Sequence, residues 1–277
     1  MRPTAPPRPP SKPEPLIEDL RWGPPLTSLR MEFRPAERRV RAFLGATAVV
    51  DSTDAMLMLE ASRLPVYYLP LEDVRTDLFL PGSRTTGSTH KGEGVYWSVG
   101  VGGRVVADAA WRYPHPPPGC PDISRYVAFH WQKLDAWFEE DEEVRGHPHD
   151  PYHRIDILES SRHVRVEVGR RVVADTRLPR LLLETGLPTR FYIPRLDVRL
   201  DLLRPSDLQT TCAYKGTTSA YWTAADQDDR QREVAWCYAT PTLECAKIAN
   251  LVSFFNERVD ITVDGVRLPR PKTPWRE

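Results

Sequence analysis

An internal repeat constrains this chain more than any other feature of its sequence. Residues Val66–Pro81 read VYYLPLEDVRTDLFLP, and residues Arg190–Pro205, at an offset of 124, read RFYIPRLDVRLDLLRP. The match continues on both sides of these segments, and one inserted residue changes the offset to 125 in the later part of each copy. So long a run of matches in one register indicates a tandem duplication, with copies near residues 35–138 and 160–268. The 277-residue chain therefore builds the same small domain twice.

Within each copy, apolar residues alternate with polar ones, which is typical of strands rather than helices. Residues 163–176 read HVRVEVGRRVVADT, which places three valines on one face before a turn at Gly169-Arg170. A second hairpin is predicted over residues 95–111, with Gly102-Gly103 in a two-residue turn.

Helices are expected only as short segments. The chain contains 28 prolines, about twice the usual share, and proline interrupts helices. The helical candidates are residues 54–60 and 123–138, and the second reads equally well as a strand. We therefore predict a mainly β fold: two tandem copies of a small antiparallel β domain, barrel-like or tent-like, with few short helices.

Composition restricts the class of protein. Lysine plus arginine and aspartate plus glutamate both number 38, so the net charge is zero and no nucleic-acid partner is expected. The sequence has no apolar run long enough for a transmembrane helix, no signal-peptide core and no C-x-x-C motif. We expect a soluble, cytoplasmic protein with no membrane partner. The predicted segments are a disordered proline-rich leader (1–34), the first β domain (35–138), an acidic and His-Pro linker (139–162), the second β domain (160–268) and a C-terminal tail (269–277).

Two lysines stand out because lysine is scarce. Only 6 of the 38 basic residues are lysines, yet Lys91 and Lys215 occupy equivalent positions in Lys-Gly loops of the two copies. If Gly102-Gly103 forms the hairpin turn, Tyr96 and Trp111 become diagonal neighbours on one face, beside the lysine loop.

The equivalent residues in copy two are Tyr221, Trp236 and Lys215. Aromatic walls with one convergent cation suit a planar or anionic small ligand. The alternative is that the rings are ordinary core packing and the lysine extends from a loop.

A second repeated pattern is Asp73-x-Arg75-x-Asp77, which recurs around Arg199 as Asp197-x-Arg199-x-Asp201. On a strand these three side chains would share a face. They could form a structural ion pair, an anion clamp or a general-base pair. Copy two also has Arg190 where copy one has Val66. If that arginine binds anions, copy two is the better binder.

Several catalytic signatures are incomplete. Gly82-x4-Gly87 is followed by Ser-Thr instead of the Lys-Ser/Thr that a phosphate-binding loop requires. Three histidines, His147, His149 and His153, could in principle ligate a metal with a neighbouring aspartate, but a linker composition explains them as well.

The strings VYYLPLEDVRTDL, HKG…YWSV and AAWRYP…YVAFHW resemble a small family known as domain of unknown function 427, sometimes labelled nucleotidyltransferase. The resemblance covers both copies and implies a compact, mainly β domain without an established activity. A nucleotidyltransferase of the common type would need a D-x-D pair that binds magnesium. The nearby acid cluster is Asp226, Asp228 and Asp229, which copy one lacks.

These observations give three functional hypotheses. The first is a tandem β-domain protein that binds a small anionic or nucleotide-like ligand near the Lys-Gly loops. The second is a structural or protein-interaction module without catalysis. The third, a metal-dependent nucleotidyltransferase, depends on the family label alone. The residues expected at the ligand site are Lys91, Tyr96, Trp111, Arg75, Lys215, Tyr221, Trp236, Arg199 and Arg190.

Overall fold

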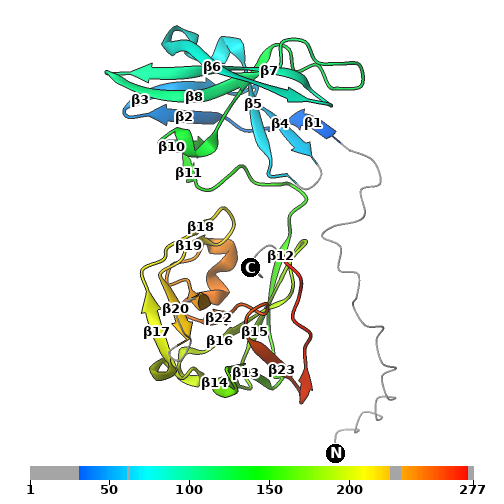
Figure 1. Ribbon diagram of the computed structural model, residues 1–277, viewed down its shortest axis with the longest axis vertical. Helices are drawn as coiled ribbons and strands as arrows, with labels where there is room; N and C mark the ends of the chain where they lie inside the picture. The colour runs from blue at the N-terminus through cyan, green and yellow to red at the C-terminus, as the bar shows by residue number, and fades with distance from the viewer. Residues whose placement is uncertain (1–30, 61–62, 225–231, 274–277) are drawn as a thin grey trace, which may run out of the picture.

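A computed structural model of the chain describes residues 31–60, 63–224 and 232–273. The chain forms two mainly β domains, one for each copy (Figure 1). The predicted leader lies outside the described residues as far as residue 30, and residues 31–34 belong to the first strand. No helix in the described part of the chain has both the length and the apolar character needed to cross a membrane.

Copy one consists of a seven-stranded and a four-stranded antiparallel sheet. The larger sheet has the order β1 (Met31–Pro35), β4 (Met56–Glu60), β5 (Val66–Pro70), β9 (Tyr126–Phe129), β8 (Arg104–Arg112), β7 (Gly92–Val101) and β6 (Phe79–Ser88). The smaller sheet has the order β11 (Glu142–Val144), β10 (Ala136–Glu139), β2 (Val40–Leu44) and β3 (Thr47–Ser52).

Copy two repeats this topology strand for strand. Its larger sheet has the order β12 (Ile155–Glu159), β15 (Arg180–Glu184), β16 (Arg190–Ile193), β22 (Val252–Phe254), β21 (Glu233–Cys237), β20 (Ala220–Ala224) and β17 (Leu203–Ser206). Its smaller sheet has the order β14 (Arg171–Thr176), β13 (Val164–Val168), β23 (Asp260–Val263) and β24 (Val266–Arg267). A short ribbon of β18 (Thr211–Cys212) and β19 (Gly216–Thr217) is added.

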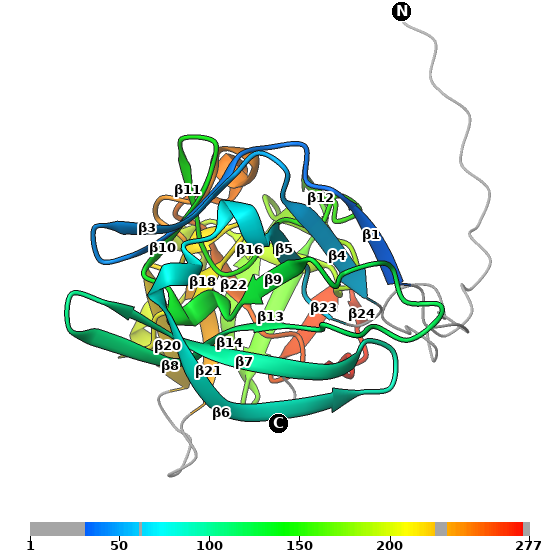
Figure 2. The same cartoon turned by 90° about the horizontal axis from the view of Figure 1, so that it is seen from above.

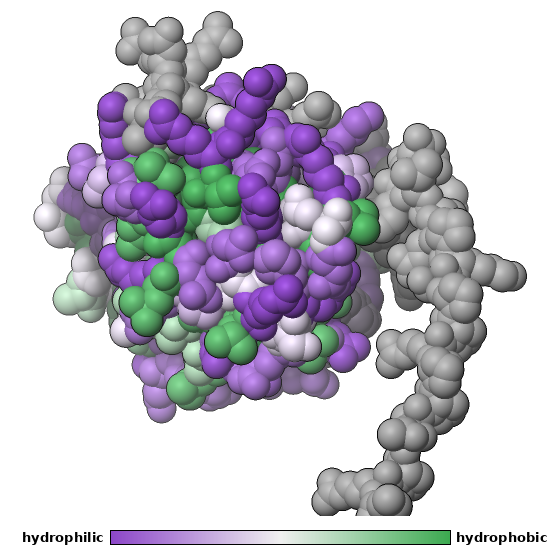
Figure 3. Space-filling model, turned by 90° about the horizontal axis from the view of Figure 1, so that it is seen from below, coloured by the Kyte–Doolittle hydropathy of each residue, from purple (hydrophilic) through white to green (hydrophobic). Residues whose placement is uncertain are grey.

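The two sheets of each copy enclose its main hydrophobic core. Apolar and polar residues alternate along the strands, so that one face of each strand contributes to this core. In β13, for example, Val164, Val166 and Val168 are buried while Arg165 is exposed. A second, smaller core lies on the other face of each large sheet and is rich in tyrosine and tryptophan. The end of the molecule at copy two is mostly hydrophilic, with a larger hydrophobic area on the left of the view and smaller ones elsewhere (Figure 3).

Both predicted hairpins are confirmed, with turns at Gly169-Arg170 and Gly102-Gly103. The helix expected at 54–60 is wrong, because residues 56–60 form β4 between two partner strands. Residues 123–138, which read equally well as helix or strand, contain β9, one 3-10 turn and most of β10, so the segment forms strands. Among the residues that the structure describes, helical structure is limited to short 3-10 segments, of which η6 (Leu243–Ile248) is six residues long.

The linker expected over 139–162 begins within the β10–β11 hairpin, where the acidic run makes the turn, and ends with β12. The pattern around Arg75 does not lie on a strand. It spans two 3-10 turns, η1 (Leu71–Asp73) and η2 (Thr76–Leu78), and copy two has the same pair, η4 (Arg195–Asp197) and η5 (Leu200–Leu202).

The large sheet of copy one curls strongly. Strand β4 lies near one edge of the strand order and β6 and β7 lie at the other. Even so, the β6–β7 loop returns to the side of β4, as Figures 1 and 2 both show. This curl brings a lysine in that loop to a glutamate at the end of β4.

Candidate functional site

The two lysines singled out in the sequence are buried, each in an ion pair with a glutamate. In copy one, Lys91 Nζ lies 2.5 Å from Glu60 Oε2, and both side chains are less than one-tenth exposed. The ammonium also lies 5.5 Å from the ring centroid of Tyr113. The ion pair joins strand β4 to the β6–β7 loop and so closes the curled sheet.

Copy two has the same ion pair with an additional partner. Lys215 Nζ lies 2.6 Å from both carboxylate oxygens of Glu184, and His153 Nε2 lies 3.1 Å from Oε1. Burial acts to raise the pKa of Glu184, but the hydrogen bond with His153 and the charge of Lys215 outweigh it, so this pKa lies below its usual range. The carboxylate is therefore ionised at neutral pH.

The residues around the ion pair are also duplicated. Trp236 Nε1 donates to the Tyr192 hydroxyl at 3.2 Å, and their counterparts Trp111 and Tyr68 are hydrogen-bonded in copy one. A cysteine near each ion pair is equivalent as well, and burial raises the pKa of both thiols. Six positions thus carry identical residues in the two copies: Glu60 and Glu184, Lys91 and Lys215, Tyr68 and Tyr192, Trp111 and Trp236, Tyr113 and Tyr238, and Cys120 and Cys245.

The predicted aromatic pair exists, with a different register. Tyr96 lies directly opposite Trp111 and not diagonal to it, because a bulge at Asp108 shifts the β7–β8 ladder. The ring centroids are 6.3 Å apart and the planes are inclined by 26°. His130 packs on Trp111 at 4.6 Å. In copy two, Tyr221 is likewise opposite Trp236, and Phe255 takes the place of the histidine. On this face, the rings of Tyr68 and Tyr113 are buried in the smaller core of copy one, and Trp111 packs against it partly buried.

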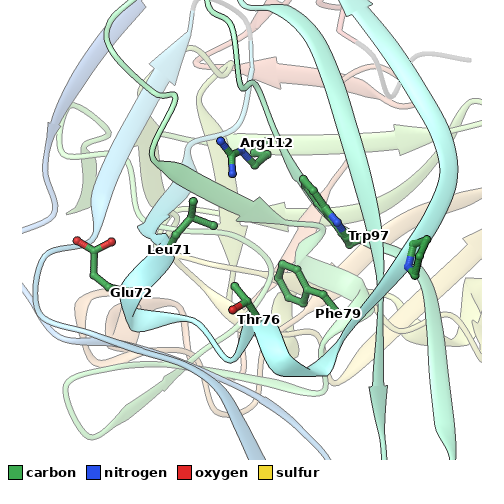
Figure 4. A pocket seen from close by; sticks show the side chains of 7 residues that line it. Leu71, Glu72, Thr76, Phe79, Trp97 and Arg112 are labelled. Atoms are coloured by element: carbon green, nitrogen blue, oxygen red, sulfur yellow. The ribbon is translucent and has the colours of Figure 1, made fainter.

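One groove of copy one runs along the Lys-Gly loop itself, where Thr86, Ser88 and Glu93 are among its lining residues. Another lies on the opposite face of the β7–β8 ladder (Figure 4). It has a volume of about 610 Å³, and Trp97 and Phe79 form one wall, stacked at 5.9 Å with planes inclined by 27°. Arg112 reaches it from β8, because Arg112 and Trp97 share a face of the ladder. Glu72 and Thr76 line the other side, from the two 3-10 turns.

The Arg112 guanidinium is incompletely paired. One of its Nη atoms donates to the Ser124 carbonyl oxygen at 2.9 Å, and its Nε is buried without a hydrogen-bond partner in the described structure. Buried donors are normally satisfied, so an orphaned one suggests a missing partner. Among the residues that line the groove, this guanidinium carries the one positive charge.

The remaining predicted arginines are already paired. Arg75 and Arg199 are exposed, and each makes a two-pronged hydrogen bond with the aspartate two residues later, Asp77 or Asp201. The first aspartate of each pattern instead accepts a hydrogen bond from a hydroxyl, as Asp73 does from Ser52. The structural ion pair is therefore the reading that the geometry favours.

Arg190 is buried and bonded to Glu257 through both Nη atoms, at 2.7 and 2.8 Å. Its charge is neutralised inside the protein. Copy one lacks both members of this ion pair: Val66 stands at the position of Arg190, and Gln132 stands at the position of Glu257.

The three linker histidines converge on Tyr214 of the copy-two lysine loop. Their ring centroids lie 5.5, 4.9 and 3.9 Å from it for His147, His149 and His153. Among the described residues, no three His, Cys, Asp or Glu side chains are grouped as metal ligands. The acid cluster at 226–229 lies outside those residues.

Sequence reasoning missed the glutamate partners, the cysteines and Arg112. The glutamates and cysteines were visible in the repeat, because each is identical in both copies. Arg112 had no such signal: its counterpart is Cys237. Its importance depends on which face of the ladder it occupies.

Comparison with known proteins agrees with the duplicated fold. The model of a family described as a domain of unknown function, DUF427, under the label NTP_transf_9, matches residues 32–140 and again residues 156–265. The search of curated proteins found no match. The chain therefore belongs to the DUF427 family and contains two of its domains in tandem.

Proposed function

We propose that this protein binds a small, planar, anionic or nucleotide-like ligand, and that the groove of copy one on the β7–β8 ladder is the binding site. The observation that carries the proposal is the Arg112 guanidinium, the one positively charged group among the residues that line the groove, beside the aromatic wall of Trp97 and Phe79. An aromatic wall with a few placed polar groups is typical of small-molecule sites.

The lysine ion pairs support this site indirectly. Lys91 precedes β7 directly, and its bond to Glu60 holds the start of the strand that carries Trp97. Buried ion pairs are weak sources of net stability, but they can select one arrangement of the chain. We assign the Lys-Gly loops this positioning role and place the ligand on the other face of the same hairpin.

Calorimetric titration of the full chain tests the proposal. The probes are benzoate, 4-aminobenzoate, AMP and inorganic phosphate, with wild type and the variants Arg112→Gln and Trp97→Leu. Loss of a hydrogen bond to a charged group costs about 1.5–3 kcal/mol, so Arg112→Gln should weaken binding roughly 10-fold to 100-fold.

Arg104→Gln is the matched control, because Arg104 lies on the same strand but is exposed and paired with Asp135. It should bind as wild type does. If none of the aromatic anions binds wild type, or if Arg112→Gln binds as tightly as the control, the groove is not a ligand site. The interaction-module hypothesis then becomes the better one.

A further inference from the structure

We infer that the chain binds one ligand, in copy one, because Arg195 covers the equivalent tryptophan in copy two. The residue at this position, Leu71 in copy one and Arg195 in copy two, determines whether the groove is open. The claim of one ligand rests on the proposed function, whereas the covering of the tryptophan can be tested without a ligand.

The tryptophan of the aromatic wall is accessible in one copy and covered in the other. Trp97 lines the groove of copy one and is only partly buried. Its counterpart Trp222 is 5% exposed and belongs to the main core of copy two. A ligand that stacks on an aromatic side chain needs a free face of that ring. Such a ligand can therefore stack on Trp97 but not on Trp222.

One position in the lining of the groove accounts for this difference. Leu71 lines the groove in copy one and lies across it from Trp97 (Figure 4). The equivalent residue is Arg195, the first residue of η4, and its guanidinium carbon lies 5.9 Å from the ring centroid of Trp222. An arginine within about 6 Å of a tryptophan ring is attracted to the ring face. The longer side chain thus reaches over the ring that Leu71 leaves open in copy one.

The cation comes from opposite sides of the groove in the two copies. Arg112 extends from β8 in copy one, whereas its counterpart Cys237 is an uncharged thiol that is 2% exposed. Burial raises the pKa of this thiol, while a hydrogen bond with Ser219 and the charge of Arg195 act in the opposite direction. The Arg195 guanidinium therefore lies near the place that Arg112 takes in copy one. Copy one is then the half that binds, contrary to the expectation from Arg190.

Acrylamide quenching of tryptophan fluorescence in the full chain tests whether Arg195 covers Trp222. Arg195→Leu, which copies Leu71, should increase the quenching constant, because it opens one face of Trp222 to the quencher. The increase should disappear when Trp222→Phe is also present, since the ring that is uncovered is then no longer a tryptophan.

Arg204→Leu is the matched control for this measurement. It also replaces an exposed arginine of copy two with the leucine found in copy one. Pro205 is paired with Trp222 and shares its face, so the preceding residue, Arg204, lies on the other face of the sheet. This variant should leave the quenching constant unchanged.

Equilibrium dialysis of the full chain counts the sites, with benzoate, 4-aminobenzoate, AMP and inorganic phosphate as probes. Wild type should bind one molecule per chain at saturation. Leu71→Arg should weaken binding about 10-fold, because the ligand must displace a cation–π contact with Trp97. Leu71→Met, which adds length without a planar cation, should bind as wild type does.

The outcomes separate this inference from the proposed function. Two molecules bound per wild-type chain, an unchanged quenching constant in Arg195→Leu, or equal affinities of Leu71→Arg and Leu71→Met would each overturn the inference. If no probe binds wild type, the proposed function fails and the claim of one ligand fails with it. The quenching result then still decides whether Arg195 covers Trp222.

Discussion

Replacement of Glu184 by glutamine tests whether the duplicated ion pair is buried and whether loss of its carboxylate destabilises the fold. The side chain keeps its size and one acceptor oxygen, but the charge that neutralises Lys215 disappears. Glu184 is 4% exposed and Lys215 is 11% exposed as side chains. Water therefore cannot replace the lost carboxylate without a change in the surrounding packing.

The expected loss of unfolding free energy is about 3–5 kcal/mol, the range found when one partner of a buried ion pair is removed. For a domain of this size the melting temperature should fall on the order of 10 °C.

Thermal and denaturant unfolding of the full chain, followed by calorimetry and tryptophan fluorescence, would measure the loss. The double variant Glu184→Leu/Lys215→Met should recover most of it, because no charge remains buried. Arg199→Gln breaks the exposed pair with Asp201 and should leave the melting temperature unchanged. If Glu184→Gln costs no more than Arg199→Gln, the pair is not closed to solvent and our account of the sheet closure is wrong.

Three further predictions follow from particular contacts. Burial acts to raise the pKa values of Glu184 and Glu257, but their hydrogen bonds and cationic partners hold both below the usual range. Their contribution to stability is thus complete above an unfolded pKa of about 4.3 and is lost as the pH falls further, so the melting temperature should be steady from pH 7 to about 5 and then drop. Gly82→Ala should lower the melting temperature, because its Cβ would lie 2.4 Å from a backbone oxygen of β7, whereas Gly87→Ala meets nothing within 4 Å and should not. Arg190→Val should destabilise the chain by stranding Glu257, and adding Glu257→Gln, which restores the copy-one pair, should recover stability in the same melting assay.

Most of what could be predicted about the fold followed from the internal repeat. Matching positions indicated two domains of one topology, and alternation located the hairpins at Gly102-Gly103 and Gly169-Arg170. The register of the first hairpin could not be predicted, because its bulge is at Asp108. An aspartate tolerates the left-handed conformation there without the glycine that would have marked it. Segment 54–60 was misassigned for a related reason: a short run does not show which strands will pair with it.

The sequence by itself determined that this chain builds one mainly β domain twice and that the scarce lysines Lys91 and Lys215 occupy equivalent positions. Both facts can be read along the chain without knowledge of its path in space. Only the tertiary structure decided what the lysines do. The curl of the sheet brings Glu60, on β4, against a loop from the other edge of the same sheet, and such a contact depends on the path of the whole chain. The groove is equally a product of the fold, since Arg112 matters because the ladder places it on the face of Trp97 and away from any carboxylate that pairs with it in the described structure.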